Sequence, residues 1–127
     1  MLRRGARASL IAQSFLYVAS GINHFWHQNF YLHIMPDHYS HPLALVGLSG
    51  VAEVFGGLGL LLPATRRFSA VGIALMLVVF FDVHVFMLRH PARFPEAPVW
   101  VLWVRIPLQF VLIAWALYYA RRDASSL

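Results

Sequence analysis

The chain has 127 residues, of which 60% are hydrophobic and only 12% are charged. A soluble domain carries about 25% charged residues, so the composition indicates a membrane protein, and the length fits a single domain. Cysteine is absent, which excludes disulfides, thiolate metal sites, iron–sulfur ligation and cysteine nucleophiles in this chain. The net charge of +5 comes from arginines. Because most of them flank apolar segments, they favour membrane anchoring over nucleic-acid binding.

Four apolar segments predict an all-α fold, a four-helix transmembrane bundle, with spans at about 8–26, 43–62, 68–88 and 98–119. The first segment follows a basic start, but it lacks a convincing cleavage site, so we expect a retained helix and not a signal peptide. Its aromatic end leads into a histidine-rich loop long enough for a short interfacial helix around 29–34. The segment 63–67 predicts a tight turn, and prolines over 91–98 predict a second loop.

The distribution of arginine predicts the orientation. With four spans, seven arginines lie on one side and two, Arg89 and Arg93, flank the other. The excess places both termini and the middle turn in the cytoplasm. The seven are Arg3, Arg4, Arg7, Arg66, Arg67, Arg121 and Arg122.

Glycine is unusually dense in the second segment, at Gly47, Gly50, Gly56, Gly57 and Gly59. Small residues let membrane helices approach closely. We therefore expect this segment to pack tightly against a neighbour.

Polar or ionisable residues interrupt all four apolar segments. Such residues are costly at bilayer depth and usually face a bundle interior or a wet cavity. At about 1.5 Å per residue, the charged ones lie between the bilayer midplane and the outer surface, with His24 near the outer mouth. The sequence therefore predicts a polar pocket that opens to the outer face and handles protons, built from His24, Glu53, Asp82, His84, Arg105 and Gln109, with Asn23 beside it.

Arg105 is the expected organiser of this pocket, because its guanidinium is always charged and can hold Glu53, Asp82 or both. Gln109, one turn further along, shares its face. Asp82 and His84 are about 200° apart on a helix, so if Asp82 faces inward, His84 lies nearer a seam or the outer loop. In the functional interpretation the two carboxylates carry protons and His24 and His84 relay them; in the other interpretation the network only fixes helix register.

The histidines raise the question of a metal or haem. His24, His27 and His84 are the candidates, but none of the histidine spacings matches a metal or haem fingerprint, so neither group is expected. Aromatic residues of the last two segments could line a slot for a quinone-like ring, although such residues usually serve packing.

Several runs resemble the DoxX-like family of small bacterial membrane proteins. They are SGINHF from Ser20, SGVAEVFGGLGLLLPATRR from Ser49, FDVHVFMLRHPARFP from Phe81 and WVLWVRIPLQ from Trp100. The resemblance covers nearly the whole chain and implies a four-helix transmembrane bundle. Some members look like subunits of quinone-linked sulfur oxidation or of membrane oxidoreductase assemblies. Where relatives often read Phe-Pro-Ala-Asn, this chain has Phe-Asp-Val-His from Phe81, which makes its pocket more acidic.

The leading hypothesis is an accessory membrane subunit of a redox system that binds a quinone or another small redox-active molecule and works with a partner redox protein. No residue is assigned a catalytic role, and whether the chain is an enzyme stays open. One alternative is a non-enzymatic scaffold or assembly factor with a structural charge network. Another is a metabolite carrier, which would need oligomerisation, and a homo-oligomer stays open.

Overall fold

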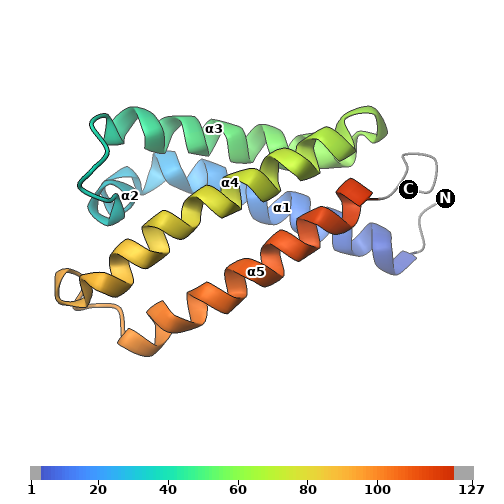
Figure 1. Cartoon of the computed structure of the whole chain (residues 1–127). Helices are drawn as coiled ribbons and strands as arrows, with labels where there is room; N and C mark the ends of the chain where they lie inside the picture. Colours follow the sequence, from blue (N-terminus) through green and yellow to red (C-terminus); the bar gives the residue numbers. More distant parts are fainter. Residues whose placement is uncertain (1–3, 122–127) are drawn as a thin grey trace.

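The computed structural model describes residues 4–121, which form an all-helical fold (Figure 1). The long helices are α1 (Arg4–Trp26), α3 (Pro42–Leu61), α4 (Pro63–Arg89) and α5 (Val99–Arg121). The short α2 (Gln28–Ile34) is the helix expected in the first loop, and a 3-10 turn, η1 (Pro91–Arg93), lies in the second. The predicted anchors Arg3 and Arg122 lie outside the described residues.

Helices α3, α4 and α5 are each long and apolar enough to cross a bilayer, so the chain is a membrane protein. With 23 residues α1 is also long enough, but it is less apolar than the other three. Helices long and apolar enough to span a membrane are therefore confirmed at three of the four expected places, and a crossing by α1 stays a prediction.

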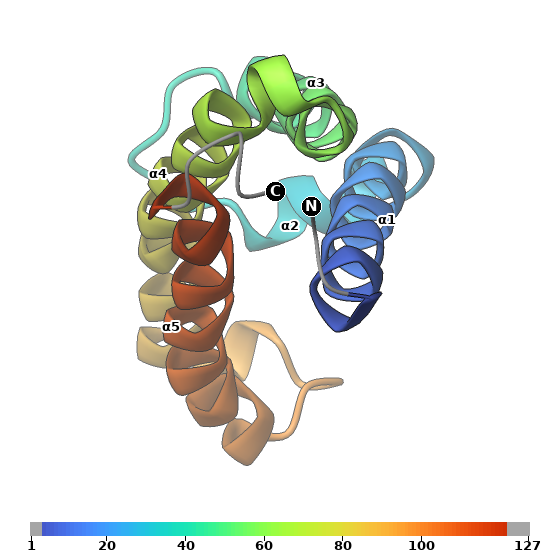
Figure 2. The same ribbon diagram turned by 90° about the vertical axis from the view of Figure 1, so that its right-hand side faces the viewer.

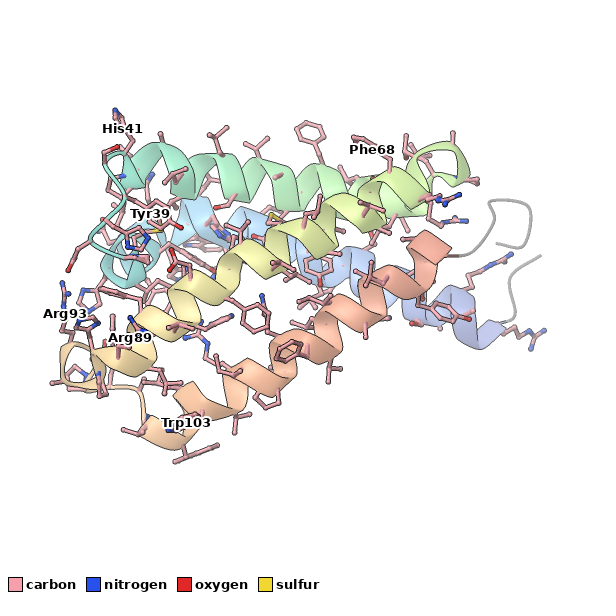
Figure 3. The ribbon with its side chains drawn as sticks, in the orientation of Figure 1. Tyr39, His41, Phe68, Arg89, Arg93 and Trp103 are labelled. Atoms are coloured by element: carbon pink, nitrogen blue, oxygen red, sulfur yellow. The ribbon has the colours of Figure 1, made fainter. Side chains whose placement is uncertain are left out.

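The four long helices follow one another around an open C, with α1 and α5 at its two tips and α2 inside it (Figure 2). One end of the molecule, the terminal end, holds the start of α1, the α3–α4 turn and the end of α5. The other, the loop end, holds α2 and both loops, with Arg89 and Arg93 near Tyr39 and His41 (Figure 3). The arginine-rich segments thus share one end, as the sequence predicts.

The turn between α3 and α4 is shorter than expected. The segment 63–67 was predicted as a tight turn, but it forms the first turn of α4, and the two helices join at Leu62. Proline suits a first helical turn because its missing N–H would be unpaired there. Two side chains of that turn also bond the last carbonyls of α3: Thr65 Oγ1 donates to Gly59 O at 2.8 Å, and Arg66 Nε donates to Leu60 O at 2.7 Å.

Helices α1 and α3 meet along a seam of small residues. A Cβ built on Gly21 would lie 2.5 Å from the carbonyl oxygen of Gly50, and one on Gly57 would lie 2.8 Å from that of Ser14. Ser14 Oγ donates to Gly57 O at 2.7 Å. Residue 14 contacts residue 57, and residue 21 contacts residue 50. The two contacts are seven residues apart along each helix, and the helices are antiparallel. The expected close packing of the glycine-rich segment is therefore confirmed, and α1 is its neighbour.

Two hydrophobic clusters occupy the two ends of the fold. The terminal-end cluster includes Leu10, Leu60, Ile73 and Tyr119, and the loop-end cluster comprises Ile34, Phe86, Met87, Phe94 and Leu102. The polar residues of the predicted pocket lie between them. The fold therefore holds a polar layer with a packed apolar core on either side.

Candidate functional site

A cavity of about 300 Å³ lies in this polar layer and is lined by residues from α1, α2, α3, α4 and α5. Two apolar side chains at its edge, Leu16 and Phe30, are 41% and 51% exposed, so the cavity reaches the surface there. Its polar lining consists of Tyr17, Ser20, His24, Tyr31, Ser49, Glu53, His84, Arg105 and Gln109.

His24 and Glu53 form a buried pair on one wall of the cavity. Their side chains are 7% and 4% exposed, and His24 Nδ1 lies 2.9 Å from Glu53 Oε2. The same Nδ1 lies 2.8 Å from the Ser20 carbonyl oxygen. The His24 ring nitrogen therefore faces both the Ser20 carbonyl and the Glu53 carboxylate. The other carboxylate oxygen, Oε1, accepts from Ser20 Oγ at 3.2 Å.

Helix α2 places an aromatic ring over this pair. Tyr31 stacks on the His24 ring with centroids 4.0 Å apart, and Asn23 Nδ2 donates to Tyr31 Oη at 2.8 Å. His24 is therefore covered and not at the outer mouth, where the sequence placed it. The depth count treated the end of each apolar segment as the membrane surface, but the chain turns back inside the C after Trp26 and packs α2 above the end of α1.

Arg105 and Gln109 approach the cavity from α5. Gln109 Nε2 donates to the Leu77 carbonyl at 2.6 Å and ties α5 to α4. Arg105 Nη1 donates to the sulfur of Met87 at 2.9 Å. The expected pairing of Arg105 with Glu53 or Asp82 is wrong: within residues 4–121 both carboxylates have other partners. The prediction failed because it matched opposite charges by depth alone.

Asp82 lies outside the cavity, contrary to expectation. Its Oδ2 accepts from Tyr39 Oη at 2.6 Å and lies 2.7 Å from His38 Nε2, so it joins α4 to the loop after α2. The hydrogen bond that Tyr39 Oη donates to the Asp82 carboxylate raises the pKa of Tyr39. His84, two residues on, faces the cavity instead. As expected for residues about 200° apart on a helix, Asp82 and His84 point in different directions. It is His84, however, and not Asp82 that faces inward.

A second charged contact closes the loop end. Arg93 Nη1 lies 2.8 Å from Asp37 Oδ2, and the Arg93 carbonyl lies 3.1 Å from His33 Nε2. Hydrogen bonding to the Arg93 guanidinium lowers the pKa of the exposed Asp37 carboxyl. These contacts fasten the first loop to η1 and so hold α2 over the cavity.

The histidines do not gather around a metal position. Within the described part of the chain, no group of three or more His, Cys, Asp or Glu side chains could hold a metal ion. Of the three candidates, His24 faces Glu53, His27 Nδ1 contacts Asn23 Oδ1, and His84 lines the cavity.

Two polar atoms of cavity-lining residues are buried without a hydrogen-bond partner: Tyr17 Oη and His84 Nδ1. Leaving such groups unpaired costs about 1–3 kcal/mol each. They are therefore the groups that a bound molecule with oxygen acceptors and donors would satisfy.

Sequence reasoning missed the polar wall that α1 contributes. Gln13, Tyr17, Ser20 and His24 recur at intervals of four, three and four residues, which places them on one helix face. Gln13 is fully buried beside this wall, and its side-chain oxygen and nitrogen are unpaired. The spacing is visible in the sequence, but the predicted pocket included only His24 of these four residues.

A family model matches residues 13–120, and its description is Domain of unknown function (DUF8561). The chain belongs to this family. No curated protein and no solved structure matches it. The family assigns no activity, so any function rests on the site itself.

Proposed function

We propose that the protein is a membrane subunit of a redox system that binds a quinone, or a similar small redox-active ring, in the polar cavity and handles its protons. The observation that carries the proposal is the set of polar groups gathered in one cavity: the buried His24–Glu53 pair, the unpaired Tyr17 Oη and His84 Nδ1, and the half-buried Arg105. The resemblance to DoxX-like proteins, some of which look like subunits of quinone-linked sulfur oxidation or of membrane oxidoreductase assemblies, supports it.

The donors suit the carbonyl oxygens of a quinone. A quinone ring carries two acceptor oxygens, and Tyr17 Oη and the Arg105 guanidinium are donors in the same cavity. Aromatic and apolar side chains supply the rest of the lining, among them Tyr31, Phe80 and Leu112. A mostly apolar pocket with a few convergent polar groups is the usual form of a small-molecule site.

The His24–Glu53 pair suits proton exchange with such a ring. Reduction of a quinone to a quinol takes up two electrons and two protons, and oxidation returns them. In the proposal a partner redox protein supplies or accepts the electrons, while Glu53 and His24 pass the protons. Histidine is the side chain whose ordinary pKa suits exchange near neutral pH. Asp82, bound to the loop, has no part in this step.

The test is direct binding of a ring-only benzoquinone or naphthoquinone to the purified protein, measured by isothermal titration calorimetry. We expect Arg105→Gln to weaken binding about 10- to 150-fold, the equivalent of one charge-assisted hydrogen bond. The matched control, Arg89→Gln, changes the same chemical group at an exposed position and should bind as the wild type does.

Absence of wild-type binding, or equal loss in cavity and control variants, contradicts the proposal. If the wild type binds no quinone and Glu53→Gln lowers thermal stability, the buried pair is structural, and the protein is better described as a membrane scaffold or assembly factor.

We further propose that α1 is a fourth span and that both termini lie in the cytoplasm of a bacterial cell, with the protein a multi-pass component of the inner membrane. The arginine-rich terminal end supports this orientation. Reporters fused at the two termini and inserted at 36–42 test it. The termini should report the cytoplasm and the loop the opposite side. If the reporters at the two termini lie on opposite sides of the membrane, α1 does not cross the membrane.

A further inference from the structure

A second hollow, larger and almost entirely apolar, runs between α3 and α4. It encloses about 530 Å³. Several of its lining side chains are open to the surroundings: Leu48 is 66% exposed, Phe55 is 68% exposed and Phe68 is 84% exposed. We call it the α3–α4 groove. Because both helices are apolar enough to cross the bilayer, we expect the groove to face lipid.

The groove adjoins the polar cavity. Four residues line both spaces: Met35, Ser49, Phe80 and Val83. Phe80 marks the boundary, since its ring faces that of His24 with centroids 6.5 Å apart while it also lines the groove. A molecule whose polar ring lies beside His24 would therefore have an apolar channel next to it, leading between α3 and α4.

The groove is long enough for a chain and not only for a ring. Along α4 its lining runs from Phe68 to Val83. These 15 residue steps, at 1.5 Å each, span about 22 Å. That exceeds half the thickness of the hydrocarbon core, about 15 Å. The groove therefore offers an extended apolar tail a path from the polar layer towards the α3–α4 turn.

We propose that the α3–α4 groove holds the apolar tail of the ligand whose ring occupies the polar cavity, and that the ligand is a lipid-soluble, isoprenoid-tailed quinone that enters from the bilayer. This inference rests on the proposed function, and it names the substrate class. The continuity of an apolar groove with a polar cavity matches the two chemically different halves of such a molecule. Phe80 and Met35, at the junction, separate ring from tail.

The glycine on the groove side of α4 allows a clean test. A Cβ added at Gly72 meets no atom within 4 Å, so a side chain can begin there without a clash, and Gly72→Leu places its bulk in the groove. Gly5→Leu is the matched control, because a Cβ there also meets nothing within 4 Å and Gly5 lies on α1, away from both spaces. Ala52→Leu is a second groove-filling variant from α3, at an exposed position.

The measurement compares a ring-only quinone with the same ring carrying an isoprenoid tail, both at known lipid-phase concentration, in protein reconstituted into nanodiscs. We expect the tailed quinone to bind wild type and Gly5→Leu about tenfold more tightly than the ring alone, the equivalent of about 1.4 kcal/mol. In Gly72→Leu and Ala52→Leu the tailed quinone should lose this advantage, while the affinity of the ring alone stays unchanged.

The failures are distinguishable. If the ring binds but the tail adds no affinity, or if the groove-filling variants keep the advantage, the tail assignment is overturned while the proposed function stands. If neither quinone binds, the proposed function fails and this inference with it. If a co-purifying phospholipid or a dimer is lost in Gly72→Leu while quinone affinities do not change, the groove belongs to an acyl chain or to a second copy, and the inference is overturned.

Discussion

The seam between α1 and α3 makes a sharp prediction about glycine. Gly21→Ala should destabilise the protein, although alanine is the better helix former by about 0.5–1 kcal/mol. The added Cβ would lie 2.5 Å from the Gly50 carbonyl oxygen, and an ordinary contact starts at 3.4 Å. The helices must therefore separate by about 0.9 Å, the difference between these two distances, because a backbone atom cannot rotate away.

The size of the effect follows from the packing that is lost. A gap of 0.5–1 Å forfeits about a quarter to a half of the dispersion energy of the atoms on either side, and overpacked interiors cost about 1–3 kcal/mol. Gly72→Ala is the matched control, because its Cβ meets nothing within 4 Å. The helix-propensity gain is common to both variants, so their unfolding free energies should differ by about 1–3 kcal/mol.

Reversible unfolding in one detergent, followed by circular dichroism, measures both variants against the wild type. Gly21→Ala should unfold earlier than the wild type, and Gly72→Ala should match or exceed it. If the two substitutions shift the unfolding midpoint equally, the seam is not tightly packed, and the close approach of α1 and α3 is wrong.

Two further predictions concern the Arg66 side chain and the hydrogen bond between Tyr39 and Asp82. Arg66 is 5% exposed and bonds the last carbonyls of α3, whereas its neighbour Arg67 is exposed. Arg66→Gln should therefore lower the free energy of unfolding by about 2–3 kcal/mol, and Arg67→Gln should lower it by less than about 0.5 kcal/mol. Chemical unfolding of both variants measures the difference. Tyr39 has a raised pKa, so its contribution to stability is present below the ordinary tyrosine pKa of about 10 and is lost as pH rises through its folded value. Asp82→Asn should return that pKa towards 10 in a tyrosinate absorbance titration read against Tyr39→Phe, and an unchanged pKa would refute the Tyr39–Asp82 hydrogen bond.

Helix positions followed readily from the sequence because apolar runs and prolines mark them. The largest error, the start of α4, arose where proline reads equally well as a turn residue and as the first residue of a helix. What decides between them here is tertiary: the bonds from Thr65 and Arg66 to the carbonyls of α3. No local pattern contains that information.

The site could be predicted as a group of residues but not as a set of contacts. Five of the six predicted residues line one cavity, because polar side chains in apolar helices have few other places to go. Which charge meets which was not predictable. A depth count along each helix fixes one coordinate, whereas pairing also depends on helix rotation and on the course of α2. Asp82 shows the difference. Its position along α4 is close to that of the cavity residue His84, but its side chain faces the loop and accepts a hydrogen bond from Tyr39.

The low hydropathy of α1 follows from its place in the fold. Its polar residues Gln13 and His24 are buried, whereas Phe15 and Ile22 on other faces are 74% and 50% exposed. The mean hydropathy of a helix averages a face that meets lipid with a face that meets a polar cavity. A helix that supplies the wall of such a cavity therefore scores below its neighbours even when its outer surface is equally apolar. The polarity of α1 is thus an argument for the cavity, because polar side chains in an apolar helix usually face the interior of a bundle.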